Sequence, residues 1–206
     1  RRLADIRTEM AKSCKIAKRS TDDVALIAVS KTRNANEIRP LLDAGQRAFG
    51  ENYVQEGVDK IAQWRVQRDS APGDAALGLQ GLQWHLIGPL QSNKTREVAQ
   101  HFDWVHSIDR LKIAQRLSEQ RPTELPPLQV CLQVNISGQS SKSGVAPTQA
   151  LALAQAHDLQ RAAYGLNAPG EGGSGSSDGG GEAMSWQPGT YDDVVREAEA
   201  RGERLA

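Results

Sequence analysis

The feature that most constrains the fold is a repeated alternation of a short apolar segment with a helical pattern. Each apolar segment reads as a strand, and a helix separates each strand from the next. Strands joined in this way pair in parallel, because a parallel connection needs a crossover of a dozen or more residues. We therefore predict an α/β fold with a parallel sheet, and its strands at 25–32, 47–50, 84–88, 103–108 and 128–136.

The predicted helices show apolar residues at intervals of three and four and have recognisable ends. The helix after the first strand is predicted to begin at the cap Asn34, with Glu37 three residues on, and to stop at Gly45. Later helices are predicted from about Ser92, from about Asp109 and after Pro147. The apolar stripes of the opening helix and of the helix after the second strand are Leu3, Ile6, Met10, Cys14 and Ala17, and Val54, Val58, Ile61 and Trp64.

The fifth predicted strand distinguishes a barrel from a flat sheet. Apolar and polar residues alternate from Leu128 to Ile136, so one face is apolar and the other carries Gln129, Cys131, Gln133 and Asn135. In a barrel the polar face lies inside, near the ligand. In a doubly wound sheet helices cover both faces, and the side-chain amides in such a row would find fewer hydrogen-bond partners there. The pattern favours a barrel.

Charge and cysteine content exclude several classes of partner. The 206 residues carry 25 Lys and Arg against 25 Asp and Glu, so there is no electrostatic case for nucleic acid or an anionic membrane. No apolar run approaches the length of a membrane span, and the first residues lack the apolar core of a signal peptide. Cys14 and Cys131 are far apart and have no metal-ligand spacing. We expect a cytoplasmic monomer without a metal.

The amino-acid composition of the chain changes near residue 165. Residues 165–189 are rich in Gly and Ser and read as a flexible linker after a barrel region at 1–164. Residues 190–206 have Thr190 and Asp193 in capping-box positions and are expected to form a short, marginal helix.

The first strand ends on a cation. The apolar run from Ala25 to Val29 leads through Ser30 to Lys31, and such a run is typical of a strand covered on both faces. Lys31 then lies at the carboxyl end of the strand, which is the functional end in parallel α/β folds. The alternative is that its side chain simply extends into solvent.

Five motifs occur in order along the first three quarters of the chain: "AVSKT" (28–32), "FGENYVQEGVDK" (49–60), "WHLIGPLQSNK" (84–94), "FDWVHSID" (102–109) and "NIS" with "SKSG" (135–144). On these motifs the chain resembles the pyridoxal phosphate homeostasis protein family, single-domain relatives of the alanine racemase barrel. The resemblance covers residues 1–155. The family implies a (β/α)8 TIM-type barrel of the third pyridoxal-phosphate fold type, with pyridoxal 5'-phosphate held as a Schiff base on Lys31.

The resemblance also implies two further cofactor-binding residues. Asn52 matches a family position near the cofactor ring, although it also suits a helix cap. His85 lies in the third strand, where a hydrogen-bonded barrel histidine is the competing interpretation. His106 and Asn135 are weaker candidates of the same kind. Lys142 lies in the loop after the fifth strand and is expected to be a solvated loop lysine.

The resemblance stops before the last three strands and the phosphate-binding segments of the family. We therefore expect an incomplete barrel with five βα units, whose tail reflects truncation, mis-splicing or a frame shift, unless an oligomer or a separate chain completes it. The leading function is a carrier of pyridoxal phosphate in its homeostasis, without a turnover reaction. The alternatives are a family remnant that no longer binds the cofactor and a racemase-like enzyme.

Overall fold

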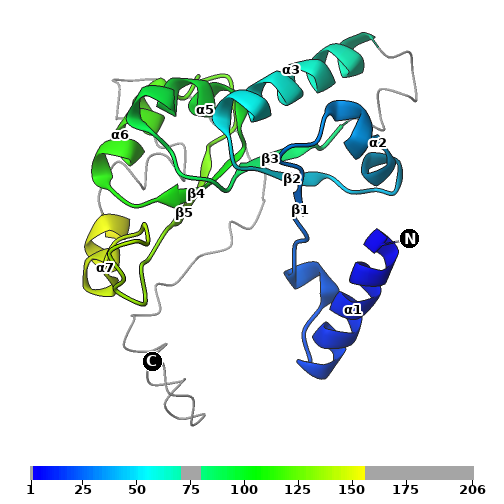
Figure 1. Cartoon of the computed structure of the whole chain (residues 1–206), viewed down its shortest axis with the longest axis horizontal. Helices are drawn as coiled ribbons and strands as arrows, with labels where there is room; N and C mark the ends of the chain where they lie inside the picture. Colours follow the sequence, from blue (N-terminus) through cyan, green and yellow to red (C-terminus); the bar gives the residue numbers. More distant parts are fainter. Residues whose placement is uncertain (1, 71–79, 156–206) are drawn as a thin grey trace, which may run out of the picture.

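A computed structural model describes residues 2–70 and 80–155 of the chain. Its centre is a parallel sheet in which each strand pairs with the strand that precedes it in the sequence (Figure 1). In a doubly wound sheet the order of strands reverses at a switch point, whereas a barrel keeps the sequential order. The prediction of a TIM-barrel type α/β fold with five βα units is therefore confirmed, and the described part of the sheet does not close. The strands are β1 (Ala28–Val29), β2 (Ala48–Glu51), β3 (Gln83–Leu86), β4 (Trp104–Ile108) and β5 (Gln129–Leu132).

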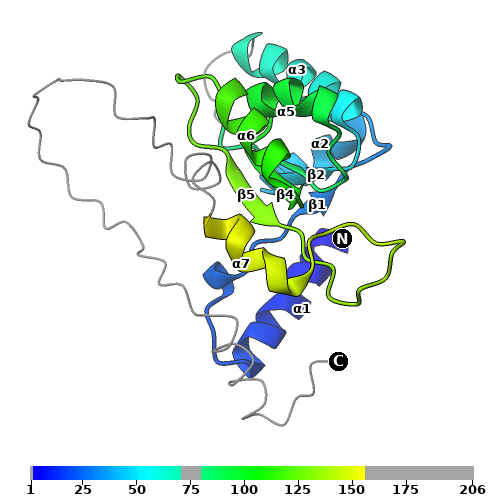
Figure 2. The same cartoon turned by 90° about the vertical axis from the view of Figure 1, so that its left-hand side faces the viewer.

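Four of the helices cover one face of this sheet. These are α2, α3, α5 and α6, whereas α1 and α7 stand apart from this layer, nearer β1 and β5 respectively (Figures 1 and 2). Leu153 of α7 packs against the same core as the four helices. The opposite face of the sheet is the one that a closed barrel encloses. The helical bounds are α1 (Arg2–Ile16), η1 (Thr21–Asp23), α2 (Ala35–Asp43), α3 (Val54–Ser70), η2 (Ser92–Lys94), α5 (Thr95–His101), α6 (Leu111–Gln120) and α7 (Pro147–Gln155).

The helix after β1 begins and ends where the sequence predicts. Asn34 Oδ1 accepts a hydrogen bond from the Glu37 amide at 3.0 Å, and Glu37 Oε2 accepts one from the Asn34 amide at 2.8 Å. This reciprocal capping box satisfies two amides that have no partner within the helix. Gly45 follows the helix with a φ of 81°, a conformation that glycine adopts without steric cost.

The core lies between the sheet and its four covering helices. The largest fully buried side chains come from β2, β3, β4, the helices and the segments just before β4 and β5, so the helical stripes and the inward residues of the strands meet in one layer. Burial of this apolar surface supplies the main stabilisation. The most deeply buried members include Ile38, Phe49, Ile61, Leu86, Phe102, Val105, Ile113 and Leu117.

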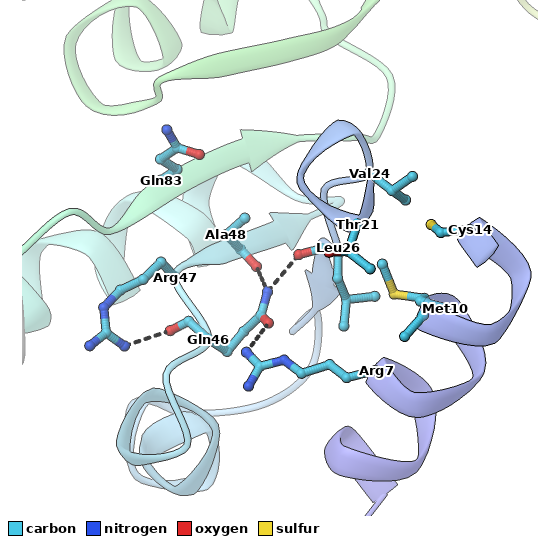
Figure 3. A pocket seen from close by; sticks show the side chains of 11 residues that line it. Arg7, Met10, Cys14, Thr21, Val24, Leu26, Gln46, Arg47, Ala48 and Gln83 are labelled. Carbon is cyan, nitrogen blue, oxygen red and sulfur yellow. Dashed lines mark hydrogen bonds between the residues drawn. The ribbon is translucent and has the colours of Figure 1, made fainter. Parts of the chain in front are cut away.

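The opening helix is tied to the start of β2 by one buried amide (Figure 3). Gln46 Nε2 donates to the carbonyl oxygens of Leu26 at 2.6 Å and Ala48 at 2.8 Å. Its Oε1 accepts from Arg7 of α1 at 3.3 Å, and a second Arg7 nitrogen donates to the Ala44 carbonyl. One glutamine therefore links α1, the segment before β1, and β2.

The predicted strand at 128–136 is too long. Strand β5 ends at Leu132, and the chain then turns so that the Asn135 amide donates to the carbonyl of Val145. Val134 only forms an isolated bridge to Val145, and Ile136 is 75 % exposed. The apolar alternation continues beyond the point where the neighbouring strand offers hydrogen bonds. The expected linker at 165–189, the helical tail at 190–206 and the proposed origin of that tail lie outside the described residues.

Candidate functional site

Lys31 lies directly beyond the carboxyl end of β1, in a turn at the edge of the sheet. Its side chain is exposed, and its amine has no hydrogen-bond or ion-pair partner within residues 2–70 and 80–155. The expectation that β1 is covered on both faces is wrong, because Val29 is 55 % exposed. Helices cover only one face of the described sheet, and β1 is an edge strand. Lys31 is therefore an accessible primary amine.

The register of the first three strands places Asn52 beside Lys31. Val29 pairs with Gly50, and Gly50 pairs with His85. Lys31 and Asn52 each follow their paired residue by two positions, so both lie just beyond the carboxyl ends of two adjacent strands. The Asn52 side chain is half-buried and makes no hydrogen bond to a described residue, so it does not cap α3. Its amide is available to a ligand at this edge.

Gly88 holds the Asn52 segment close to the end of β3. A Cβ atom on Gly88 would lie 2.1 Å from the carbonyl oxygen of Asn52. That separation is far shorter than any real contact, and the obstacle is backbone that cannot rotate away. Glycine at position 88 is therefore required for the two carboxyl-end turns to approach each other.

His85 pairs with Gly50 and therefore lies two residues before the level of Asn52, within β3. Its side chain is on the face of the sheet opposite the helices. It alternates with Trp84 and Leu86, which belong to the helix-facing core. His85 Nδ1 lies 2.9 Å from His106 Nε2, and the ring of Trp104 stacks on His85 with centroids 5.4 Å apart. The other ring nitrogen, His85 Nε2, is buried and has no partner in the described part of the chain.

The histidine pair is held neutral by its surroundings. Burial, with a smaller contribution from the charge of His106, lowers the pKa of His85 to about 4. Burial also lowers the pKa of His106. At neutral pH one ring therefore donates to the other, and His85 Nε2 can meet a ligand without adding a positive charge.

A buried charged cluster beneath Lys31 was not predicted from the sequence. Glu51 Oε1 accepts from Ser30 Oγ at 2.6 Å and from Lys60 Nζ at 2.6 Å, and Lys60 also donates to the Ser30 carbonyl at 2.8 Å. The side chains of Lys60 and Glu51 are 3 % and 0 % exposed. The sequence shows only a glutamate at the end of a strand and a lysine beside the apolar stripe of the next helix, and neither position by itself predicts burial.

Two residues after β5, the weaker candidate Asn135 and the loop lysine Lys142, do not join this site. Asn135 donates to the carbonyl oxygens of Gln139 at 2.9 Å and Lys142 at 3.3 Å, so its side chain closes its own loop. The Lys142 side chain is exposed in that loop. The structure brings together Lys31 and Asn52, with His85 and His106 on the face beneath them.

These residues fit an aromatic aldehyde better than a metal ion. Lys31 offers a free amine, which can form an imine with an aldehyde, while Asn52 offers an amide and His85 a buried nitrogen that has no partner among the described residues. Within the described residues no group of three or more His, Cys, Asp or Glu side chains is placed to hold a metal. None of the described helices is both long enough and apolar enough to cross a membrane.

Comparison with known proteins finds relatives that share one name. Proteins named pyridoxal phosphate homeostasis protein are 54 % identical over 143 residues in Escherichia coli K12 and 59 % identical over 137 residues in Vibrio cholerae. These matches cover 69 % and 66 % of this chain. They cover 57 % and 54 % of the relatives, so the chain spans little more than half of their length.

Solved structures show the same likeness. PipY of Synechococcus elongatus without PLP is 35 % identical, with a TM-score of 0.54 over 72 % of this chain and 66 % of that one. The structure of PipY with PLP bound matches with a TM-score of 0.53 over 72 % and 65 %. The family model of the alanine racemase N-terminal domain matches residues 7–166. The chain therefore belongs to the alanine racemase N-terminal domain family.

Proposed function

We propose that this chain binds pyridoxal 5'-phosphate as a Schiff base on Lys31 and serves in the homeostasis of that cofactor, without turning over a substrate. The observation that carries the proposal is the exposed Lys31 amine, which has no partner in residues 2–70 and 80–155 and lies at the carboxyl edge of the sheet. In parallel α/β folds this edge is the one that binds ligands.

Formation of a Schiff base requires mainly an accessible amine at this position. Lys31 would hold the cofactor through its amine, because an amine condenses with an aldehyde with loss of one molecule of water. Among residues 2–70 and 80–155 no ion pair to Lys31 has to be broken first. Asn52 lies just beyond the end of the adjacent strand for a contact at the ring, and His85 Nε2 provides a neutral polar group deeper on the concave face.

The relatives support the same function. The similar proteins of E. coli and V. cholerae carry the name pyridoxal phosphate homeostasis protein, and PipY has been solved with PLP bound. A cytoplasmic location and a monomeric state belong to the proposal. The two free cysteines Cys14 and Cys131 support a reducing compartment.

The test is to incubate the purified chain with pyridoxal 5'-phosphate, reduce any imine with borohydride, and map the modified lysines by peptide mass. We expect the label to concentrate on Lys31 and to be lost in the Lys31→Ala variant. Lys112→Ala, which removes another exposed lysine on α6, is the matched control and should label as the wild type does. Label spread evenly over surface lysines would contradict the proposal and favour a remnant that no longer holds the cofactor.

The racemase-like alternative has its own assay. Racemisation needs a second acid or base on the opposite side of the cofactor ring. If L-alanine lost its optical rotation, and if that loss depended on both the added cofactor and Lys31, the protein would be an enzyme and not a carrier. We expect the rotation to stay constant.

A further inference from the structure

The backbone on both sides of Lys31 is held by two side chains of α3. Lys60 Nζ donates to the carbonyl oxygen of Ser30 at 2.8 Å. Glu56 Oε1 accepts from the amide of Thr32. Lys60 and Glu56 lie one helical turn apart, with 3.4 Å between Nζ and Oε1. The only residue between the two anchored positions is Lys31.

This arrangement contains two features that cost stability. Lys60 and Glu51 are buried charges, and the second carboxylate oxygen of Glu51 has no partner among the described residues. Thr32 has a φ of 62°, which a β-branched residue rarely adopts. Strain of this kind persists where surrounding contacts determine the conformation, and it is concentrated at functional sites. Both features here adjoin the same lysine.

We propose that Glu56 and Lys60 are positioning residues for Lys31, an inference that rests on the proposed function. Together they fix the direction in which the Lys31 side chain leaves the backbone. A lysine side chain is long and flexible, so a fixed starting point confines its amine to the neighbourhood of Asn52. Holding a nucleophile close to its target is worth a large factor in rate, and neither positioning residue needs to contact the cofactor.

Glu56→Ala tests this inference without removing a buried charge, because the Glu56 side chain is 29 % exposed. The first measurement is hydrogen exchange of the Thr32 amide by NMR, which needs no cofactor. The second is the rate at which borohydride traps label on Lys31. We expect Thr32 to exchange about tenfold faster and labelling to slow by about tenfold, as loss of one charge-assisted hydrogen bond implies.

Two further variants separate positioning from general damage. Glu97→Ala removes a glutamate of similar exposure, 35 %, that pairs with Lys94 on another helix, and it should leave both measurements unchanged. Glu56→Gln keeps an oxygen for the Thr32 amide and should restore most of the protection and most of the labelling rate.

The outcomes are distinct. We call the two hydrogen bonds that join the side chains of Glu56 and Lys60 to the backbone around Lys31 the clamp. An unchanged hydrogen-exchange rate of the Thr32 amide in Glu56→Ala would show that the clamp does not hold the backbone. Faster exchange with an unchanged labelling rate would overturn its role in positioning. If the wild-type chain labels Lys31 no better than other lysines, both the proposed function and the positioning role are wrong. The exchange rate of the Thr32 amide would still show whether the hydrogen bond to Glu56 forms.

Discussion

Protonation of His85 should destabilise this protein between pH 7.5 and pH 4. Burial lowers the pKa of His85 from 6.5 to about 4, so the unfolded chain binds a proton that the folded chain resists. The unfolded state therefore holds more protons in this window, and the free energy of unfolding falls as the pH falls. The stability concerned is fully present above pH 6.5 and is lost as the pH drops towards 4.

The magnitude follows from the two pKa values. Relative to pH 7.5, the loss from this one residue is about 1 kcal/mol at pH 5.5 and reaches about 3 kcal/mol when His85 is fully protonated in both states. His85 as a whole residue is 4 % exposed, so little solvent screening reduces this figure.

Urea denaturation at a series of pH values measures this loss against the His85→Gln variant, which cannot take up the proton. We expect the wild-type free energy of unfolding to fall more steeply than that of the variant, by about 1 kcal/mol between pH 7.5 and 5.5. NMR titration of the His85 ring should give a midpoint near 4. Parallel curves for the two proteins, or a ring midpoint near 6.5, would refute the reasoning.

Three further predictions concern Gly88, Lys60 and Cys131. Gly88→Ala places a Cβ atom against the Asn52 carbonyl and should lower the free energy of unfolding by about 3 kcal/mol in urea denaturation, and a change near zero would contradict the close approach. Lys60→Met leaves the Glu51 carboxylate buried without its partner and should cost roughly 3–5 kcal/mol, whereas a double variant that also carries Glu51→Leu should recover most of it. Burial raises the pKa of the Cys131 thiol, so it should react with iodoacetamide at pH 8 more slowly than free cysteine, and equal rates would count against its burial.

The parts of the fold that could be predicted from the sequence depend on local patterns. The capping box at Asn34 and Glu37 and the glycine stop at Gly45 involve residues close in sequence, and each forms as expected. The alternation of strands and helices is local in the same sense. The ends of strands are less predictable, because β5 stops where its neighbour no longer offers hydrogen bonds, although the alternation of its own residues continues.

The candidate site, too, could be predicted from the sequence only where it depends on local patterns. Lys31 could be found from the end of one apolar run, but the pairing of His85 with His106 depends on the register between β3 and β4. The contact of Lys60 with Glu51 depends on how α3 packs beneath β2, and no periodicity reveals that a lysine beside an apolar stripe is buried. Side chains that meet across elements therefore required the three-dimensional structure.

The sequential order of the strands, β1 to β5, has a consequence for how the protein is made. Each strand after β1 docks on a partner that has already left the ribosome, so none of these later strands has to wait for a following segment before it can pair. Each loop to be closed is only one βα unit long, which keeps its entropic cost small. The nascent chain can thus grow its sheet in the direction of synthesis, with the newest strand always forming the open edge that receives the next.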